Sequence, residues 1–166
     1  LRGRIDVLPQ TYLRIVKKKA ADVEAHTRIG AILGGGSKEQ TEAMGHFGRM
    51  LGMMIILRDD WIDLMDPEES RHRTRQESLP LPILYGMQDP RANSKLRPIF
   101  LQASIRKRDT QTILEIISES RAMRQYLSLM HKLAADANSK LRSLKYDSVQ
   151  HLEILTKATL LPSIEF

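Results

Sequence analysis

The sequence predicts an all-α protein, a bundle of helices formed within a single domain. Two long stretches, residues 37–64 and 121–144, carry apolar side chains at the spacing of an amphipathic helix. No segment alternates apolar and polar residues with period two, and no repeat of fixed length occurs. The 166 residues are enough to bury one core. These observations favour helices packed on helices.

The first expected elements are a helix pair, a glycine turn and a long central helix. Pro9 suits a first helical position, and a helical pattern continues to Leu33, where three glycines stop it. Ser37, followed three residues later by Gln40, has the pattern of a capping box. The helix that opens there continues to residue 64, a length of roughly 40 Å.

The second half of the chain predicts a loop and then shorter helices. Residues 68–78 are charged and lack an apolar period, so we expect a loop after Asp66. Asp89-Pro90 is expected to break a short helix that begins at Pro80. The predicted helices are 80–87, 97–103, 110–117 with Asp109 as a capping residue, 121–144, and one after Asp147.

Three glycines share one face of the predicted central helix: Gly45, Gly48 and Gly52. Each costs a helix up to about 1 kcal/mol relative to alanine. Close approach of a neighbouring helix is the usual compensation, and we favour it over a space left for a substrate.

Composition limits the classes of function. The formal charge of +6 favours an anionic partner, whereas an aromatic content of 5% offers few stacking surfaces and argues against nucleic acid. The chain has no cysteine, which excludes disulfides and thiolate chemistry and suits a cytoplasmic location. No apolar run is long enough for a transmembrane segment. Since the chain begins without Met, we expect further residues upstream.

Three carboxylates crowd the predicted end of the central helix: Asp59, Asp60 and Asp63. Asp59 and Asp63 lie about 40° apart around the helix axis, with Asp60 offset by a further 60° or so. These charges are disfavoured by one another and by the macrodipole at a helix C-terminus. A hard divalent cation such as Mg²⁺, which prefers carboxylate oxygens, relieves that repulsion. Spacing alone also fits an ordinary solvated helix face.

Several stretches together resemble the C-terminal half of the trans-isoprenyl diphosphate synthases, also called polyprenyl synthetases. Residues 12–20 look like the family's helix with a Lys-Thr pair, and 28–34 follow at the expected distance. Residues 48–52 with 59–63 look like its second aspartate-rich motif. Arg71-His72-Arg73 lies where the family has a basic residue, and 81–85 look like its Leu-Pro helix start. Residues 75–82 are similar to archaeal members.

The resemblance implies a prenyltransferase with the all-α fold of the isoprenoid synthases, of which residues 1–166 form the C-terminal part of one polyprenyl synthetase domain. In that family Mg²⁺ ions bound by two aspartate motifs clamp an allylic diphosphate. The diphosphate leaves, and isopentenyl diphosphate attacks the allylic carbocation. A homodimer is implied as well.

Carried over residue by residue, the resemblance gives Asp59 as a catalytic residue and direct Mg²⁺ ligand. Asp60 and Asp63 complete the metal site, through water or by orienting it. Lys19 is expected to hold the diphosphate and to take part in catalysis. Arg73 is expected to bind the same substrate, with Arg71 as its substitute. The alternative is that these basic residues lie on a solvated helix face and in an ordinary polar loop.

The sequence departs from the family pattern in its carbocation site. Ala20 stands where the family has Thr, and Ile55-Ile56 stand where it has Phe-Gln, so two side-chain dipoles are missing. No first aspartate motif precedes Asp59. Two alternatives to an active prenyltransferase therefore stay open. One is a non-catalytic or degenerate subunit of a prenyl diphosphate synthase, and the other is a terpene cyclase of the same fold.

Overall fold

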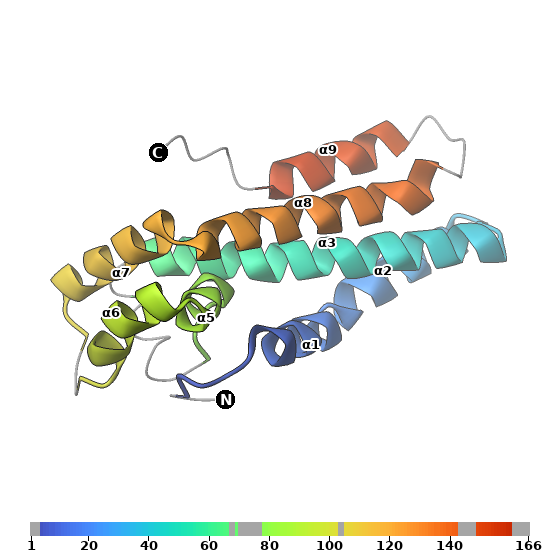
Figure 1. Cartoon of the computed structure of the whole chain (residues 1–166). Coiled ribbons are helices and arrows are strands. Elements are labelled where there is room, and N and C mark those ends of the chain that lie inside the picture. Colours follow the sequence, from blue (N-terminus) through green and yellow to red (C-terminus); the bar gives the residue numbers. More distant parts are fainter. Residues whose placement is uncertain (1–3, 67–68, 70–77, 103–104, 143–148, 161–166) are drawn as a thin grey trace. The chain divides into compact units, whose positions relative to one another are not determined.

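The computed structural model describes residues 4–66, 69, 78–102, 105–142 and 149–160. These residues form helices and no strand, which confirms the all-α prediction (Figure 1). None of the described helices is long and apolar enough to cross a lipid bilayer. The helices are α1 (Pro9–Lys19), α2 (Ala21–Leu33), α3 (Lys38–Met65), α5 (Leu81–Gln88), α6 (Pro90–Phe100), α7 (Lys107–Glu119), α8 (Arg121–Arg142) and α9 (Val149–Thr159).

The chain folds into two compact units, each made from two separate stretches of sequence. The first unit contains Leu1–Leu13 and Asp59–Ser128, and the second contains Arg14–Arg58 and Leu129–Phe166. Helices α1, α3 and α8 each contribute residues to both units. The units are therefore not consecutive domains along the chain.

The predicted boundary between α2 and α3 is confirmed. Gly35 has a φ of 74°, a left-handed conformation that glycine adopts without strain. The backbone N–H of Ser37 donates to Gln40 Oε1 at 2.5 Å, and the N–H of Gln40 donates to Ser37 Oγ at 3.2 Å. These reciprocal bonds form a capping box and fix the start of α3.

The glycine face of α3 packs against α2 in the second unit. A Cβ atom on Gly52 would lie 3.0 Å from the Cβ atoms of Ala20 and Val23. A Cβ atom on Gly48 would overlap Thr27 Oγ1 and lie 2.8 Å from the carbonyl oxygen of Val23. The prediction of close helix approach is confirmed, and this face has no space for a substrate.

Glu24 joins the same two helices by charge. Its carboxylate accepts hydrogen bonds from Arg28 Nε, at 3.0 Å, and from Arg49 Nε on α3. Arg28 also reaches Glu42 at 3.0 Å. Although burial opposes ionisation, the two guanidinium groups hold the pKa of Glu24 below its ordinary value.

In the first unit, α5, α6 and α7 pack together (Figure 1). Gly86 on α5 allows this approach, because a Cβ atom there would lie 2.6 Å from Ile117 Cδ1 on α7 and 2.9 Å from Leu96 Cδ1 on α6. Both of those neighbours are fully buried. The three short helices thus share one apolar centre.

The start of α6 differs from the prediction. The helix begins at Pro90 and not at residue 97. Asp89 is its N-cap and accepts hydrogen bonds from the backbone N–H groups of Arg91, at 2.9 Å, and Ala92, at 3.2 Å. Pro is favoured at a first helical position, so Asp89-Pro90 both ends one helix and opens the next.

Helix α7 also begins earlier than predicted, at Lys107. Asp109 is its third residue and not its N-cap. The Asp109 carboxylate reaches back and accepts a hydrogen bond from the backbone N–H of Arg106 at 2.8 Å. Hydrogen bonds from Arg106 hold the pKa of Asp109 below its ordinary value. An acid at this position stabilises the helix start as a capping residue would.

Most of the apolar residues that give the two long helices their amphipathic pattern are buried. Trp61, Met50, Met53 and Met54 are buried, and Met44 is half-buried. Along α8 the buried residues of this pattern are Met123, Tyr126, Met130, Leu133, Ala134 and Leu141, and Leu127 is half-buried. Two apolar residues of α3, Ile55 and Ile62, are exposed by 38% and 48%.

Substitutions of two glycines test the α2–α3 contact. Gly48→Ala places a Cβ against backbone atoms of α2, which costs about 1–3 kcal/mol, more than the gain of about 1 kcal/mol in helix propensity. Gly30→Ala is the matched control, because its Cβ meets nothing within 4 Å. We expect urea unfolding to show a less stable Gly48→Ala protein and a Gly30→Ala protein that is as stable as wild type or more so. Equal effects of the two substitutions would contradict the packing.

Candidate active site

The three predicted acids lie in the last two turns of α3, within the first unit. Asp60 is buried, with 3% of its surface exposed, Asp63 is half-buried, and Asp59 is exposed. The end of a helix presents partial negative charge, so these carboxylates need compensating partners. Their differing exposure divides them into one structural acid and two that solvent can reach.

Asp60 has a specific partner on α1. The hydroxyl of Tyr12 donates a short hydrogen bond to Asp60 Oδ2, and this bond is buried. Tyr12 is itself 7% exposed. A buried carboxylate without hydrogen bonds is strongly disfavoured, so the phenol helps to make burial of Asp60 tolerable. The bond also fixes the orientation of the carboxylate.

A second tyrosine, Tyr126 on α8, lies near the same acids. Its ring is fully buried and lies 6.2 Å from the ring of Trp61, centroid to centroid. Burial raises the pKa of the Tyr126 hydroxyl far above its ordinary value, and the negative charges of Asp60 and Asp59 raise it further. The phenol therefore stays protonated and neutral beside two carboxylates.

The carboxylates fit a divalent cation as part of a larger ligand set. Among the described residues, no group of three or more Asp, Glu or His side chains lies close enough together to hold a metal ion. Mg²⁺ is commonly held by one or two carboxylates, with water and substrate phosphates as its other ligands. Oxygen donors of the type found at Asp59, Asp60 and Asp63 suit that mode. Their role as metal ligands stays a prediction.

Of the three predicted basic residues, the structure describes only Lys19. Lys19 is the last residue of α1, is exposed, and belongs to the second unit, whereas the acids belong to the first. Arg71 and Arg73 lie outside the described residues. Their approach to a bound diphosphate therefore stays a prediction.

Sequence reasoning missed the part that the two tyrosines play. Tyr12 stood within the stretch that resembles the family's lysine helix, and Tyr126 was only one residue of the amphipathic stretch 121–144. The pairing itself, across 48 residues of sequence, leaves no local pattern.

The three residues that depart from the family pattern, Ala20, Ile55 and Ile56, differ in how far they are buried. Ala20 is fully buried, and its Cβ lies against the glycine face of α3 at Gly52. Ile55 is exposed by 38%, and Ile56 is half-buried. None of these three side chains offers a dipole to a cation.

Comparison with known proteins gives one family. Residues 2–117 match the family model of polyprenyl synthetase. A short chain isoprenyl diphosphate synthase of Methanothermobacter thermautotrophicus, an archaeal protein, is 40% identical over 68 residues, which are 40% of this chain and 21% of that protein. Component 2 of the heptaprenyl diphosphate synthase of Bacillus subtilis is 26% identical over 141 residues, which are 81% of this chain and 40% of that protein.

The fold also matches a solved structure. The geranylgeranyl pyrophosphate synthase of Corynebacterium glutamicum, complexed with calcium and isoprenyl diphosphate, superposes with a TM-score of 0.78 at 23% identity. The match covers 91% of this chain and 49% of that one. At this identity the likeness establishes the fold. The chain thus spans about half of that structure and less than half of the two curated relatives.

The environment of Tyr126 predicts a pH dependence of stability. In the unfolded chain a tyrosine ionises near pH 10, whereas folded Tyr126 keeps its proton to higher pH. Its stabilising effect is fully present below pH 10 and is lost as the pH rises further. We expect the stability of wild type relative to Tyr126→Phe to fall by up to about 1.4 kcal/mol per pH unit in that range. Urea unfolding of both proteins near neutral pH and in the alkaline range measures this, and parallel curves would refute it.

Proposed function

This chain belongs to the polyprenyl synthetase family, since residues 2–117 match the family model, and we propose that it forms the C-terminal part of a prenyltransferase. In this proposal, residues 1–166 belong to a single polyprenyl synthetase domain whose remaining residues supply the other aspartate motif. The whole protein condenses isopentenyl diphosphate with an allylic diphosphate. It acts in the cytoplasm as a homodimer.

The observation that supports this proposal most directly is the acidic end of α3. One carboxylate, Asp60, is held by Tyr12, and Asp59 is exposed beside it. An arrangement in which one acid is fixed and the next is open to solvent suits the binding of a hydrated cation together with phosphate. A solvated helix face would need neither the burial of Asp60 nor its hydrogen bond.

The reaction begins with heterolysis of the allylic C–O bond, and the electron pair leaves with the diphosphate. Mg²⁺, when bound, neutralises the negative charge that grows on this leaving group. Lys19 and Arg73, with Arg71 as the substitute, bind diphosphate oxygens by charge-assisted hydrogen bonds. The double bond of isopentenyl diphosphate then attacks the carbocation, and loss of a proton restores an alkene. Tyr12 holds Asp60 by its hydrogen bond, and the neutral Tyr126 lies against Trp61 beside the acids.

A second candidate function is a subunit that binds diphosphate without turnover. The surroundings of Ala20 favour it, because this residue is buried against α3 and offers no hydroxyl to a carbocation. One relative, from Bacillus subtilis, is named as a component of a heptaprenyl diphosphate synthase. A terpene cyclase would consume an allylic diphosphate alone, so consumption of isopentenyl diphosphate separates it from both candidates.

Activity of the full-length protein tests the role of Asp59. With Mg²⁺, labelled isopentenyl diphosphate and allylic primers, we expect longer prenyl diphosphates, and chelation of the metal should stop their formation. Asp59→Asn should lower the rate by at least about a hundredfold, since it removes charge from the metal-binding end of the helix. Glu39→Gln is the matched control, because Glu39 is an exposed acid in the first turn of the same helix.

The outcomes of that assay separate the candidates. Product that is lost in Asp59→Asn and kept in Glu39→Gln supports the enzyme. Absence of product, with Mg²⁺-dependent binding of diphosphate intact, supports the subunit. Full activity of Asp59→Asn would contradict the assigned site.

Metal binding tests Tyr12 as a positioning residue. Tyr12→Phe keeps the ring but removes the donor to Asp60, so Mg²⁺ binding in the presence of inorganic diphosphate should weaken about ten- to hundredfold. Calorimetry measures this without turnover. Tyr85→Phe is the control, since Tyr85 is a half-buried tyrosine on α5 of the same unit. Equal Mg²⁺ affinity in Tyr12→Phe and Tyr85→Phe would show that the bond is only structural.

A further inference from the structure

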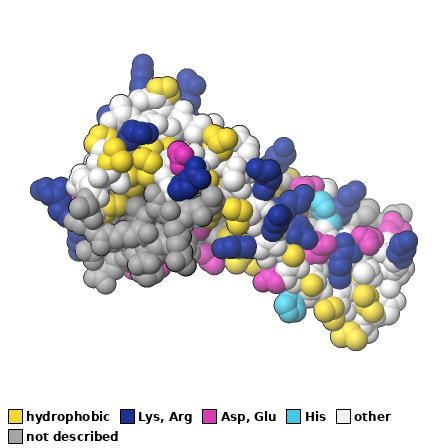
Figure 2. Space-filling view, turned by 90° about the horizontal axis from the view of Figure 1, so that it is seen from below, with side chains coloured by type: hydrophobic (Ala, Val, Ile, Leu, Met, Phe, Trp, Pro, Cys, Tyr) yellow, Lys and Arg dark blue, Asp and Glu magenta, His cyan; other side chains and the backbone are white. Residues whose placement is uncertain are grey.

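The strongest remaining feature is a hollow in the first unit, formed by α6, α7 and the start of α8. Basic side chains are widespread on the surface and are interspersed with acidic ones, as Figure 2 shows for one face, so a basic residue alone carries no argument. A hollow in the second unit is also lined by basic side chains, but two of them, Arg28 and Arg49, form ion pairs with Glu24. In the hollow of the first unit, four basic side chains line a single volume of about 590 Å³. That size lies within the usual range for small-ligand sites.

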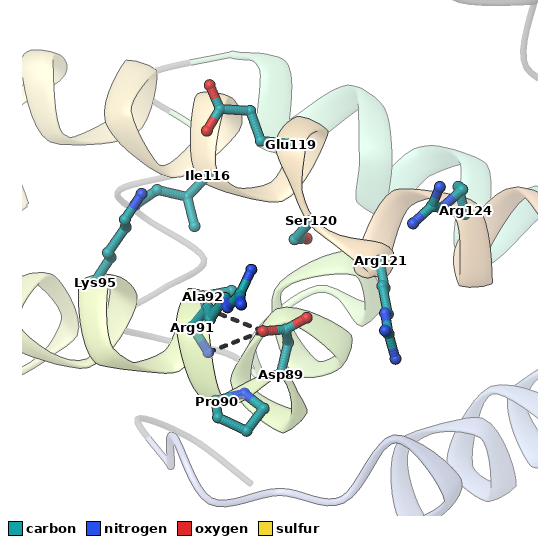
Figure 3. Close-up of a pocket in the computed structure, with 10 residues that line it drawn as sticks. All are labelled: Asp89, Pro90, Arg91, Ala92, Lys95, Ile116, Glu119, Ser120, Arg121 and Arg124. Carbon is teal, nitrogen blue, oxygen red and sulfur yellow. Dashed lines mark hydrogen bonds between the residues drawn. The ribbon is translucent and has the colours of Figure 1, made fainter.

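The four cations come from two helices: Arg91 and Lys95 from α6, and Arg121 and Arg124 from α8 (Figure 3). All four are exposed, and none makes an ion pair with another side chain in the part of the chain that the structure describes. Like charges held around one volume repel each other. A multiply charged anion bound among the four side chains would attract each of them and offset their mutual repulsion.

Two carboxylates, Asp89 and Glu119, also line the hollow. Asp89 is committed to the helix start, because its Oδ1 accepts hydrogen bonds from the backbone N–H groups of Arg91 and Ala92 (Figure 3). Glu119 ends α7 and is exposed. The four cations therefore outnumber the two acids, and one of these acids, Asp89, already accepts backbone hydrogen bonds at the start of α6.

The backbone around the hollow is fixed, and its helix starts are already satisfied. Ser120 is the single residue between α7 and α8, and its hydroxyl donates to the carbonyl of Ile117 at 2.8 Å and accepts from the N–H of Ala122 at 3.1 Å. The first amides of α6 bond Asp89 in the same way. Recognition of an anion would therefore use the long basic side chains and not free backbone amides.

We propose that this hollow binds a small ligand carrying two or more phosphate charges, held by Arg91, Lys95, Arg121 and Arg124. Guanidinium groups present paired donors that match phosphate oxygens, and lysine adds a point charge. The apolar wall is slight, because Ile116 and Ala92 are exposed by only 8% and 4%, so a hydrocarbon chain would find little contact. The phosphate belongs either to a free phosphorylated metabolite or to a lipid headgroup.

Binding of inorganic diphosphate to the full-length protein, measured by calorimetry with EDTA present, tests this proposal. Without divalent cations the acids at the end of α3 repel diphosphate, and binding that is lost in the hollow variant but kept in the control reports the basic hollow. We expect the double variant Arg91→Gln/Arg124→Gln to bind at least about tenfold more weakly. The control Lys132→Gln/Lys157→Gln removes the same charge from two exposed positions on α8 and α9 and should bind within about twofold of wild type.

A second arm separates the two phosphate sources. Flotation with vesicles of phosphatidylcholine, with and without an anionic phospholipid, is measured for the same three proteins. Loss of diphosphate binding in the hollow variant alone assigns a free ligand, and loss of binding to anionic vesicles in that variant alone assigns a headgroup. Equal losses in both double variants, or no binding by wild type in either arm, would overturn the proposal. Mg²⁺-dependent prenyl transfer, assayed in parallel, reports on the proposed function separately.

Discussion

Burial of the Asp60 carboxylate is the constraint on which the first unit depends. A carboxylate taken out of water is tolerated only with strong hydrogen bonds, and Tyr12 of α1 supplies one. That bond joins a residue near the start of the chain to the end of α3, beside the contact between Trp61 and Tyr126. The acidic end is thus held in place by protein groups before any ligand arrives. Such preorganisation is what the proposed electrostatic site would require, because no reorganisation is then needed during the proposed reaction.

Helix α3 meets two different demands along its length. In the second unit its glycines let α2 approach until a Cβ on Gly48 or Gly52 would crowd Val23. In the first unit its last turns carry acids that the helix dipole disfavours. The glycines lower the helix propensity of α3, and its carboxylates repel one another. This helix is therefore stabilised by packing against its neighbours more than by its intrinsic helix propensity.

Local signals made much of the fold predictable. The capping box at Ser37 and the glycines after Leu33 are signals that lie within a few residues of the helix ends they mark. The structure confirms both. The starts of α6 and α7 were wrong, because an aspartate marks a helix start from more than one position. In the site, the crowding of Asp59, Asp60 and Asp63 was visible in sequence, but the Tyr12 bond was not, since it joins residues distant along the chain. Lys19, Arg71 and Arg73 stay predictions.

The wholly buried methyl group of Ala20 limits which side chains fit at this position. Threonine carries two more heavy atoms, and at this position they would need room beside Gly52 and Val23, which already crowd the same space. Replacement of Ala20 by threonine is therefore disfavoured unless the facing helix shifts or the new side chain turns elsewhere. The tight contact between α2 and α3 thus favours a small side chain at position 20.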